Sequence, residues 1–398
     1  MGNTSGDIIC SKEQSPMPWK AQDTMSLRRE FVELALHPDA NRRELCRRFA
    51  VSPKTAYKWL GRYREEGDAA LADRSRRPRG SPARTHDAME ARVIALRRRH
   101  PAWGGRKISR RLGDLGHGEV PAPSTVTDIL HRHGLIDAKC SAQHTPWMRF
   151  EHPEPNQLWQ IDFKGYVDTP AGRCHPLTVL DDHSRFNLVL QACGRTDSAT
   201  VQPWLTAAFR RYGLPVRINA DNGAPWGSPR ACEHGISRLS AWLIRVGVRV
   251  SHSRPAHPQT NGKDERFHRS LKAEVLGVRS FEDLSSAQYA FDCWRVIYNH
   301  ERPHEALGMD TPISRYRLSP RPFPEVLPAI EYGPDDHVLC PDANGWLRFR
   351  GHPLNVPRAL HHQPIAFRPR ANEDSVFDVY FCHQRILHID LRDHSRSE

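Results

Sequence analysis

An acidic residue stands in the middle of an apolar, strand-forming segment, which is an unusual place for a charge. The segment is 158–163 and its acid is Asp162, with an aliphatic residue before it and an aromatic residue after it. Burying a carboxylate there is costly unless a partner compensates for its charge. One interpretation is an Asp that is ion-paired or that lies in an edge strand. The other is a metal ligand, which needs further acids elsewhere in the chain.

Two later segments supply such acids. Asp221 follows a short strand-like segment and precedes Asn222 and Gly223, a pattern that by itself is typical of a turn. Glu265 lies near the start of a predicted helix that runs towards Leu276. Polar residues at the spacing i, i+3, i+4 and i+7 lie on one face of that helix, namely Glu265, His268, Arg269 and Lys272. An ordinary solvated charged face would show the same pattern.

Taken together and in this order, the acids resemble the DDE triad of the retroviral-integrase and transposase superfamily. The family's W-x-x-D, D-N-G and P-x-x-N-G-x-x-E-R motifs are matched by residues 159–162, 221–223 and 258–266. The tail that closes the core of insertion-sequence transposases is matched by residues 298–299, 302–304, 306–308 and 311–312. The chain therefore resembles an insertion-sequence DDE transposase with a retroviral-type integrase catalytic core.

The resemblance implies that Asp162, Asp221 and Glu265 are the catalytic residues and bind two Mg²⁺ ions, which Mn²⁺ can replace. Carboxylates suit hard cations, and two ions suit phosphodiester chemistry. Asp162 is expected to bridge both ions, with Asp221 on one and Glu265 on the other. The expected supporting residues are Asn222, Gly223, Asn261 and Gly262.

Two features complicate the triad. Asp221 and Glu265 are 44 positions apart, more than is typical of the family, and the extra residues are expected in the loop 224–235. Asp264 is a rival acid, about 100° round the helix from Glu265. The family's acid immediately precedes Arg, which favours Glu265.

Charge is distributed unevenly along the 398 residues, whose net charge is +12. Residues 1–150 carry 28 Lys and Arg against 17 Asp and Glu, whereas the remainder carries 30 against 29. This predicts a DNA-binding arm joined to a nearly neutral catalytic part. The nine cysteines form no C-x-x-C pair, so a disulfide framework and a cysteine-rich zinc site are not expected. Without an apolar spanning run or a signal-peptide core, the expected location is the cytoplasm.

The first 72 residues are predicted to contain a disordered lead, 1–24, and a helix-turn-helix domain, 25–72. Ser52 and Pro53 are typical of a helix start. In the helix that follows, Tyr57, Leu60 and Tyr63 are predicted to pack inward. The predicted DNA contacts are Lys54, Thr55, Lys58, Trp59 and Arg62. An ordinary three-helix bundle with a solvated basic face is the alternative.

The rest of the chain divides by composition. A basic linker, 73–86, would be solvated or lie in a minor groove. A second helix-turn-helix domain, 87–137, is predicted to contact DNA through Arg106, Lys107, Ser124 and Thr125. The predicted order continues with a linker, 138–156, the RNase H-like integrase core, 157–318, and a small β domain, 325–398, which would bind DNA, bind another subunit or cap the core. The fold class is thus multidomain: α-helical helix-turn-helix units, then an α/β RNase H-like core, then a β-rich C-terminal domain.

Within the core, Asp181 and Asp182 lie in a predicted turn and are expected to be structural. Further DNA contacts are predicted at Lys263, Arg266 and Lys272. The expected function is a DNA transposase that binds the terminal inverted repeats of a mobile element, cleaves the ends and joins them to target DNA, as a homodimer or higher homo-oligomer. The alternatives are a DNA-binding repressor with a relic core, and a simple RNase H-like nuclease.

Overall fold

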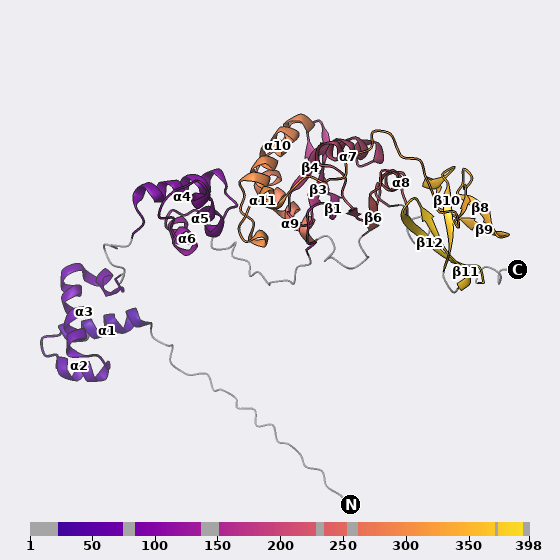
Figure 1. The fold of residues 1–398 in the computed structure, drawn as a ribbon. Helices are drawn as coiled ribbons and strands as arrows, with labels where there is room; N and C mark the ends of the chain where they lie inside the picture. The colour runs from indigo at the N-terminus through magenta and orange to yellow at the C-terminus, as the bar shows by residue number, and fades with distance from the viewer. Residues whose placement is uncertain are drawn as a thin grey trace, which may run out of the picture. The chain divides into compact units, whose positions relative to one another are not determined.

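The computed structural model describes residues 23–74, 84–136, 151–227, 235–252, 262–370 and 373–392. The chain forms two compact units, residues 1–84 and 85–398. The first consists of helices, and the second contains further helices, a mixed sheet and a C-terminal β region (Figure 1).

The first unit is built on three helices, α1 (Thr24–Leu36), α2 (Arg42–Arg48) and α3 (Pro53–Glu66), followed by a 3₁₀ turn. The predicted start of α3 is confirmed, because the Ser52 side chain accepts a hydrogen bond from the Thr55 amide at 3.2 Å. Of the α3 residues predicted to pack inward, Leu60 is buried in the helical core and Tyr63 packs against it, but the prediction is wrong for Tyr57. Trp59 is buried at 7% exposure, whereas Tyr57 is 60% exposed.

A second group of three helices follows, α4 (Asp87–Arg99), α5 (Gly105–Asp114) and α6 (Pro123–Arg132). Their apolar faces enclose a core that includes the fully buried Trp103. Helices α5 and α6 cross closely at Gly105, where a Cβ atom would stand 2.4 Å from the Pro123 carbonyl oxygen.

The core of the second unit is a mixed sheet in which the strands are ordered β4-β3-β1-β5-β6, with β2 paired to β3. Strand β1 runs antiparallel to β3 and parallel to β5, and β5 is parallel to β6. The mixed-sheet order predicted for an RNase H-like core is confirmed. The strands are β1 (Leu158–Phe163), β2 (Val167–Thr169), β3 (Gly172–Asp181), β4 (Asn187–Cys193), β5 (Arg217–Ala220) and β6 (Arg249–His252).

Helices cover both faces of this sheet (Figure 1). On one face α7 (Ser198–Tyr212) and α8 (Arg238–Arg245) pack against the side chains of Trp159 and Ile161. On the other face lie α9 (Gly262–Leu271), which ends in a π-helical turn, and α10 (Leu284–His300). Because side chains alternate along a strand, Asp162 projects from β1 towards the face covered by α9 and α10.

The C-terminal region contains a four-stranded antiparallel sheet, β12-β11-β10-β7, and a two-stranded one, β8-β9. Their inner faces share one core, in which the rings of Phe349 and Phe367 stack 4.3 Å apart. Side chains alternate in burial over 377–381, where Phe377, Val379 and Phe381 are buried and Asp378 and Tyr380 are partly exposed. The strands are β7 (His337–Leu339), β8 (Trp346–Phe349), β9 (His352–Asn355), β10 (Ile365–Arg370), β11 (Glu373–Phe381) and β12 (Gln384–Asp390).

Candidate active site and nucleic-acid interface

Asp162 and Asp221, two of the three predicted acids, lie at the same edge of the sheet because β1 and β5 are parallel neighbours. The last paired residues of the two strands are Gln160 and Asn219. Asp162 and Asp221 each lie two positions further on, so both are at the edge where these strands end. The Asp221 side chain accepts a hydrogen bond from the Gly223 amide at 3.0 Å. The backbone carbonyl oxygen of Asp221 lies 2.8 Å from Nδ1 of His252 at the end of β6.

Asp162 carries the clearest electrostatic signature of the site. Burial raises the pKa of its carboxyl group to about 6, although the Phe163 amide stabilises the charged form with a 2.8 Å hydrogen bond. The negative charges of Asp221 and Glu265 raise this pKa further, whereas Lys164 lowers it. The structure therefore places Asp221 and Glu265 within electrostatic reach of Asp162.

Helix α9 presents two different faces, and this separates the two rival acids. Glu265 is exposed on the outer face, with Arg269 and Lys272. Asp264 and His268 are buried on the inner face. The predicted sharing of one polar face by Glu265 and His268 is therefore wrong for His268. Burial, aided by Lys164, lowers the pKa of its imidazole to about 3, so it is neutral near pH 7.

The buried face of α9 forms polar contacts with the sheet, and the sequence did not predict these contacts. The Thr178 hydroxyl lies 2.9 Å from Nε2 of His268 and 3.3 Å from Oδ1 of Asp264. Burial, together with the charges of Asp162 and Glu265, raises the pKa of Asp264 well above its usual range. The i, i+4 spacing of Asp264 and His268 was the available signal, but it required knowing which face was buried.

A second polar network, centred on Asp182, connects the first turn of α9 to β1. This buried carboxylate forms an ion pair with Lys263 and accepts hydrogen bonds from the His152 amide and the Gln160 side chain, both at 3.0 Å. Gln160 in turn accepts a hydrogen bond from the Asp264 amide at 3.2 Å. The network thereby fixes the helix turn that bears Glu265.

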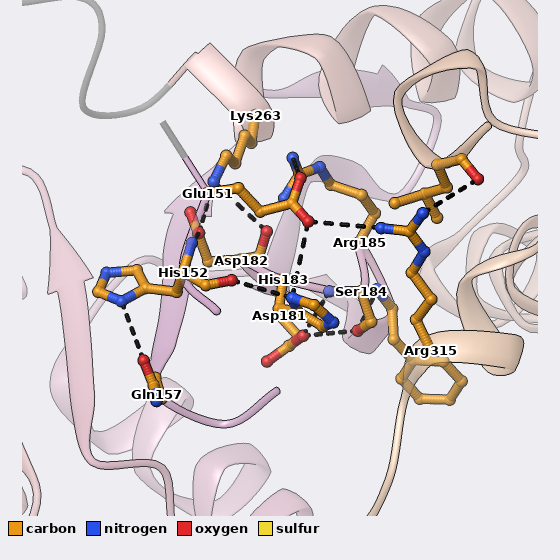
Figure 2. A network of polar contacts seen from close by, with 12 residues as sticks. Glu151, His152, Gln157, Asp181, Asp182, His183, Ser184, Arg185, Lys263 and Arg315 are labelled. Atoms are coloured by element: carbon orange, nitrogen blue, oxygen red, sulfur yellow. Dashed lines mark hydrogen bonds and ion pairs between the residues drawn. The ribbon is translucent and has the colours of Figure 1, made fainter. Parts of the chain in front are cut away.

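Figure 2 shows the same network extending through Glu151. The Glu151 carboxylate lies 3.1 Å from Arg185, 3.6 Å from His183 and 3.5 Å from Arg315. Next to it, Asp181 accepts hydrogen bonds from the Ser184 amide in the turn and from the Asn156 amide that precedes β1, as the structural interpretation of Asp181 and Asp182 predicts.

The supporting and DNA-contacting residues predicted around α9 have different outcomes. Gly262 begins α9, and Asn222 is exposed beside Asp221. Asn261 lies outside the described residues. Arg266 and Lys272 are exposed on the outer face. Lys263 is half-buried and its amine forms an ion pair with Asp182, and its role as a DNA contact stays a prediction.

In the first unit, the predicted surface residues of α3 include one that is not at the surface. Trp59 packs into the helical core, with the Arg28 guanidinium 4.1 Å from its ring centre. Lys54 and Lys58 are exposed, and the Thr55 hydroxyl lies 2.9 Å from that of Ser52. Arg62 is half-buried, with its guanidinium 5.0 Å from the Trp59 ring. The availability of Trp59 for DNA contact is thus corrected, and the other predicted contacts stay predictions.

The second helical group has an open cleft of about 370 Å³ at the starts of α5 and α6. Arg106, Lys107 and Ser124 line it, with Glu305 from the core beside them. Burial, together with the charges of Arg302 and Arg266, lowers the pKa of Lys107 to about 8. The predicted contacts Arg106, Lys107 and Ser124 therefore share one cleft, and Thr125 lies next to it in the chain.

Comparison with known families agrees with this arrangement. Integrase core domain models match residues 152–258 and 246–312, and the model of the C-terminal domain of IS481 family transposases matches residues 336–397. A helix-turn-helix domain model matches residues 27–79, and a homeodomain-like domain model matches residues 55–130.

Several of the similar proteins belong to insertion elements. The chain is 27% identical over 237 residues to an uncharacterised 39.2 kDa protein of insertion element IS476 from Xanthomonas euvesicatoria, covering 58% of this chain and 65% of that protein. It is 27% identical to the transposase of IS904 from Lactococcus lactis, over 41% of this chain and 62% of that protein. The match thus spans less than two thirds of these relatives. Among solved structures, the catalytic core domain of HTLV-2 integrase is 16% identical over 42% of this chain and 99% of that one, with a TM-score of 0.32.

The fold, the carboxylates at the ends of β1 and β5, and the matching family models define a protein with helix-turn-helix domains and an integrase core. More particularly, its C-terminal part matches the C-terminal domain of IS481 family transposases, and the chain is similar to proteins of insertion elements. No helix in the described part of the chain has the length and apolar character needed to cross a membrane.

Proposed function

We propose that this protein is a metal-dependent DNA transposase that cleaves the ends of a mobile element and joins them to target DNA. The observation that carries the proposal is the electrostatic environment of Asp162, whose pKa is raised to about 6 mainly by burial and further by the nearby charges of Asp221 and Glu265. A site of this kind gains stability from cations.

The donor set fits divalent cations with a preference for oxygen. Asp162, Asp221 and Glu265 would hold two Mg²⁺ ions, or Mn²⁺ in their place, with Asp162 as the shared ligand. Such ions activate an attacking oxygen and neutralise a leaving one. The Asp182 network would hold the backbone of the turn that carries Glu265.

Two phosphoryl transfers are proposed at this site. In the first, a water oxygen attacks the phosphorus at the element end, the bond to the 3′ oxygen breaks, and a free 3′-OH remains. In the second, that 3′-OH attacks a target phosphorus and displaces the target's own 3′ oxygen. Each step forms one P–O bond and breaks one, so no covalent enzyme intermediate is needed.

The helical domains would bind the terminal inverted repeats. The charge excess lies in the first 150 residues, where α3 exposes Lys54 and Lys58 and the α5–α6 cleft contains Arg106 and Lys107. Cations in such positions set affinity through phosphate contacts. We propose further that the protein works on DNA in the cytoplasm, as a homodimer or a higher homo-oligomer.

A strand-transfer assay tests the proposal. An oligonucleotide of the element's own end and a plasmid target are incubated with the full chain and Mg²⁺ or Mn²⁺. The wild type is expected to form joined product, and Asp162→Asn and Glu265→Gln are expected to lose it while still binding the end. Asp168→Asn is the matched control, because Asp168 is a solvent-exposed acid on β2.

Other outcomes identify the alternatives. Full joining by Glu265→Gln would show that the acidic assignment is wrong. Specific end binding without cleavage or joining in the wild type would identify a repressor with a relic core. Cleavage with equal activity on scrambled DNA would identify a simple nuclease.

A further inference from the structure

A second cluster of residue types that bind metal ions lies behind the edge of the sheet where Asp162 and Asp221 are located. Asp264 and His268 are separated by one helical turn on the inner face of α9, and this face packs against β1 and β3. A carboxylate oxygen of Asp162, one of Asp264 and a ring nitrogen of His268 all lie within 4.8 Å of one another. Two ligands at i and i+4 on a helix, with a third from a neighbouring strand, form a common ligand geometry for metal ions.

One atom of this cluster lacks a partner that its burial demands. Asp264 is 1% exposed, and its Oδ2 atom has no hydrogen-bond partner among the described residues. That oxygen lies 3.4 Å from Nε2 of His268. An unpaired buried carboxylate oxygen next to a second carboxylate is costly, and a cation held between them would satisfy both.

The donor set differs in kind from the three carboxylates described above. It has two carboxylate oxygens and one imidazole nitrogen, a mixture that suits first-row transition ions such as Mn²⁺, Co²⁺ and Zn²⁺. Mg²⁺ is bound mainly through oxygen. The nitrogen therefore provides a spectroscopic signature that the Asp162, Asp221 and Glu265 set lacks.

We propose that Asp162, Asp264 and His268 bind a divalent transition-metal ion, and that Asp162 is the ligand shared with the catalytic carboxylates. The proposal rests on the proposed function only in that shared residue, because the site itself is defined by binding and not by DNA joining. It assigns Asp264 a role as a ligand and makes His268 the source of metal selectivity.

The test measures metal binding directly. The full chain, stripped of metal, is titrated with Mn²⁺ and Co²⁺, and pulsed electron paramagnetic resonance of the Mn²⁺ form reports coupling to an imidazole nitrogen. The wild type is expected to show nitrogen coupling. His268→Gln is expected to lose this coupling, and Asp264→Asn is expected to weaken Mn²⁺ affinity by about tenfold or more.

Matched variants separate this site from its surroundings. His252→Gln removes the imidazole beside Asp221 and is expected to retain the coupling. Glu265→Gln is expected to retain it as well, even though joining is lost. Circular dichroism establishes that each variant is folded, and His268→Asn replaces His268→Gln if the latter is not.

Three results would overturn the proposal: Mn²⁺ bound without nitrogen coupling in the wild type, coupling that survives in a folded His268 variant, or unchanged Mn²⁺ affinity in Asp264→Asn. The last would mean that Asp264 carries a proton in place of a metal. A wild type that shows the coupling but joins no DNA would contradict the proposed function and leave this inference standing.

Discussion

His304, in the tail that closes the core, is buried beside positive charges. Its ring lies against Tyr298, and its Nε2 atom has no hydrogen-bond partner among the described residues. Burial, with added repulsion from Arg302 and Lys107, holds its pKa well below the usual range. The folded protein therefore keeps His304 neutral under conditions in which the unfolded chain would protonate it.

This difference predicts a pH dependence of stability. The contribution of His304 is fully present above the unfolded pKa of about 6.5 and is lost as the pH falls below that value, because the unfolded state then binds more protons. The melting temperature is expected to fall between pH 7.5 and pH 5.5, and to fall less in His304→Asn. The exposed His361, changed to Asn, is the control. Equal pH slopes in wild type and His304→Asn would contradict the prediction.

At the scale of elements, the crossing of α5 and α6 depends on a single missing side chain. A Cβ atom on Gly105 would stand 2.3 Å from the Thr127 hydroxyl oxygen and 2.4 Å from the Pro123 carbonyl oxygen. The backbone atom cannot rotate away, so the helices would have to separate. The neighbouring Gly104 has open space around the same position.

Gly105→Ala is therefore expected to destabilise the second unit by about 1–3 kcal/mol, as overpacking does. Gly104→Ala is expected to be nearly neutral. Urea denaturation followed by tryptophan fluorescence measures both, since Trp103 is fully buried in the same core. Similar midpoints for the two variants would show that the crossing is not limited by Gly105.

At the scale of the molecule, the α4–α6 group and the integrase core form parts of one compact unit. Arg111 on α5 pairs with Glu301 at the end of α10 at 2.6 Å, and both side chains are largely shielded from solvent. Ile297 of α10 also packs against the core of the helical group. The second helical group is thereby joined directly to the helix that packs on the mixed sheet.

Charge reversal tests this connection. Arg111→Glu or Glu301→Arg alone is expected to lower the free energy of unfolding by about 1–3 kcal/mol, because each leaves like charges facing one another. The double variant is expected to recover most of the loss. A double-mutant cycle from urea melts gives the coupling, and a coupling near zero would show that the pair contributes nothing.

Several features of this protein arise from local interactions and could be predicted from the sequence. The Ser52 cap, the alternation in 377–381 and the three acids of the predicted triad depend on residue types and short spacings, which a sequence displays directly. The RNase H-like core was expected from the resemblance that these motifs carry. These features could be predicted because the interactions that produce them are formed within a few residues or repeat with a fixed period.

Only the tertiary structure decided which face of each helix is buried. Trp59 and Tyr57 exchanged their predicted places, and Asp264 and His268 turned inward while Glu265 stayed exposed. Lys263 pairs with Asp182, a residue 81 positions away. The sequence marks such residues as polar, but their partners are set by which elements pack together, and that depends on the free energy of the whole core.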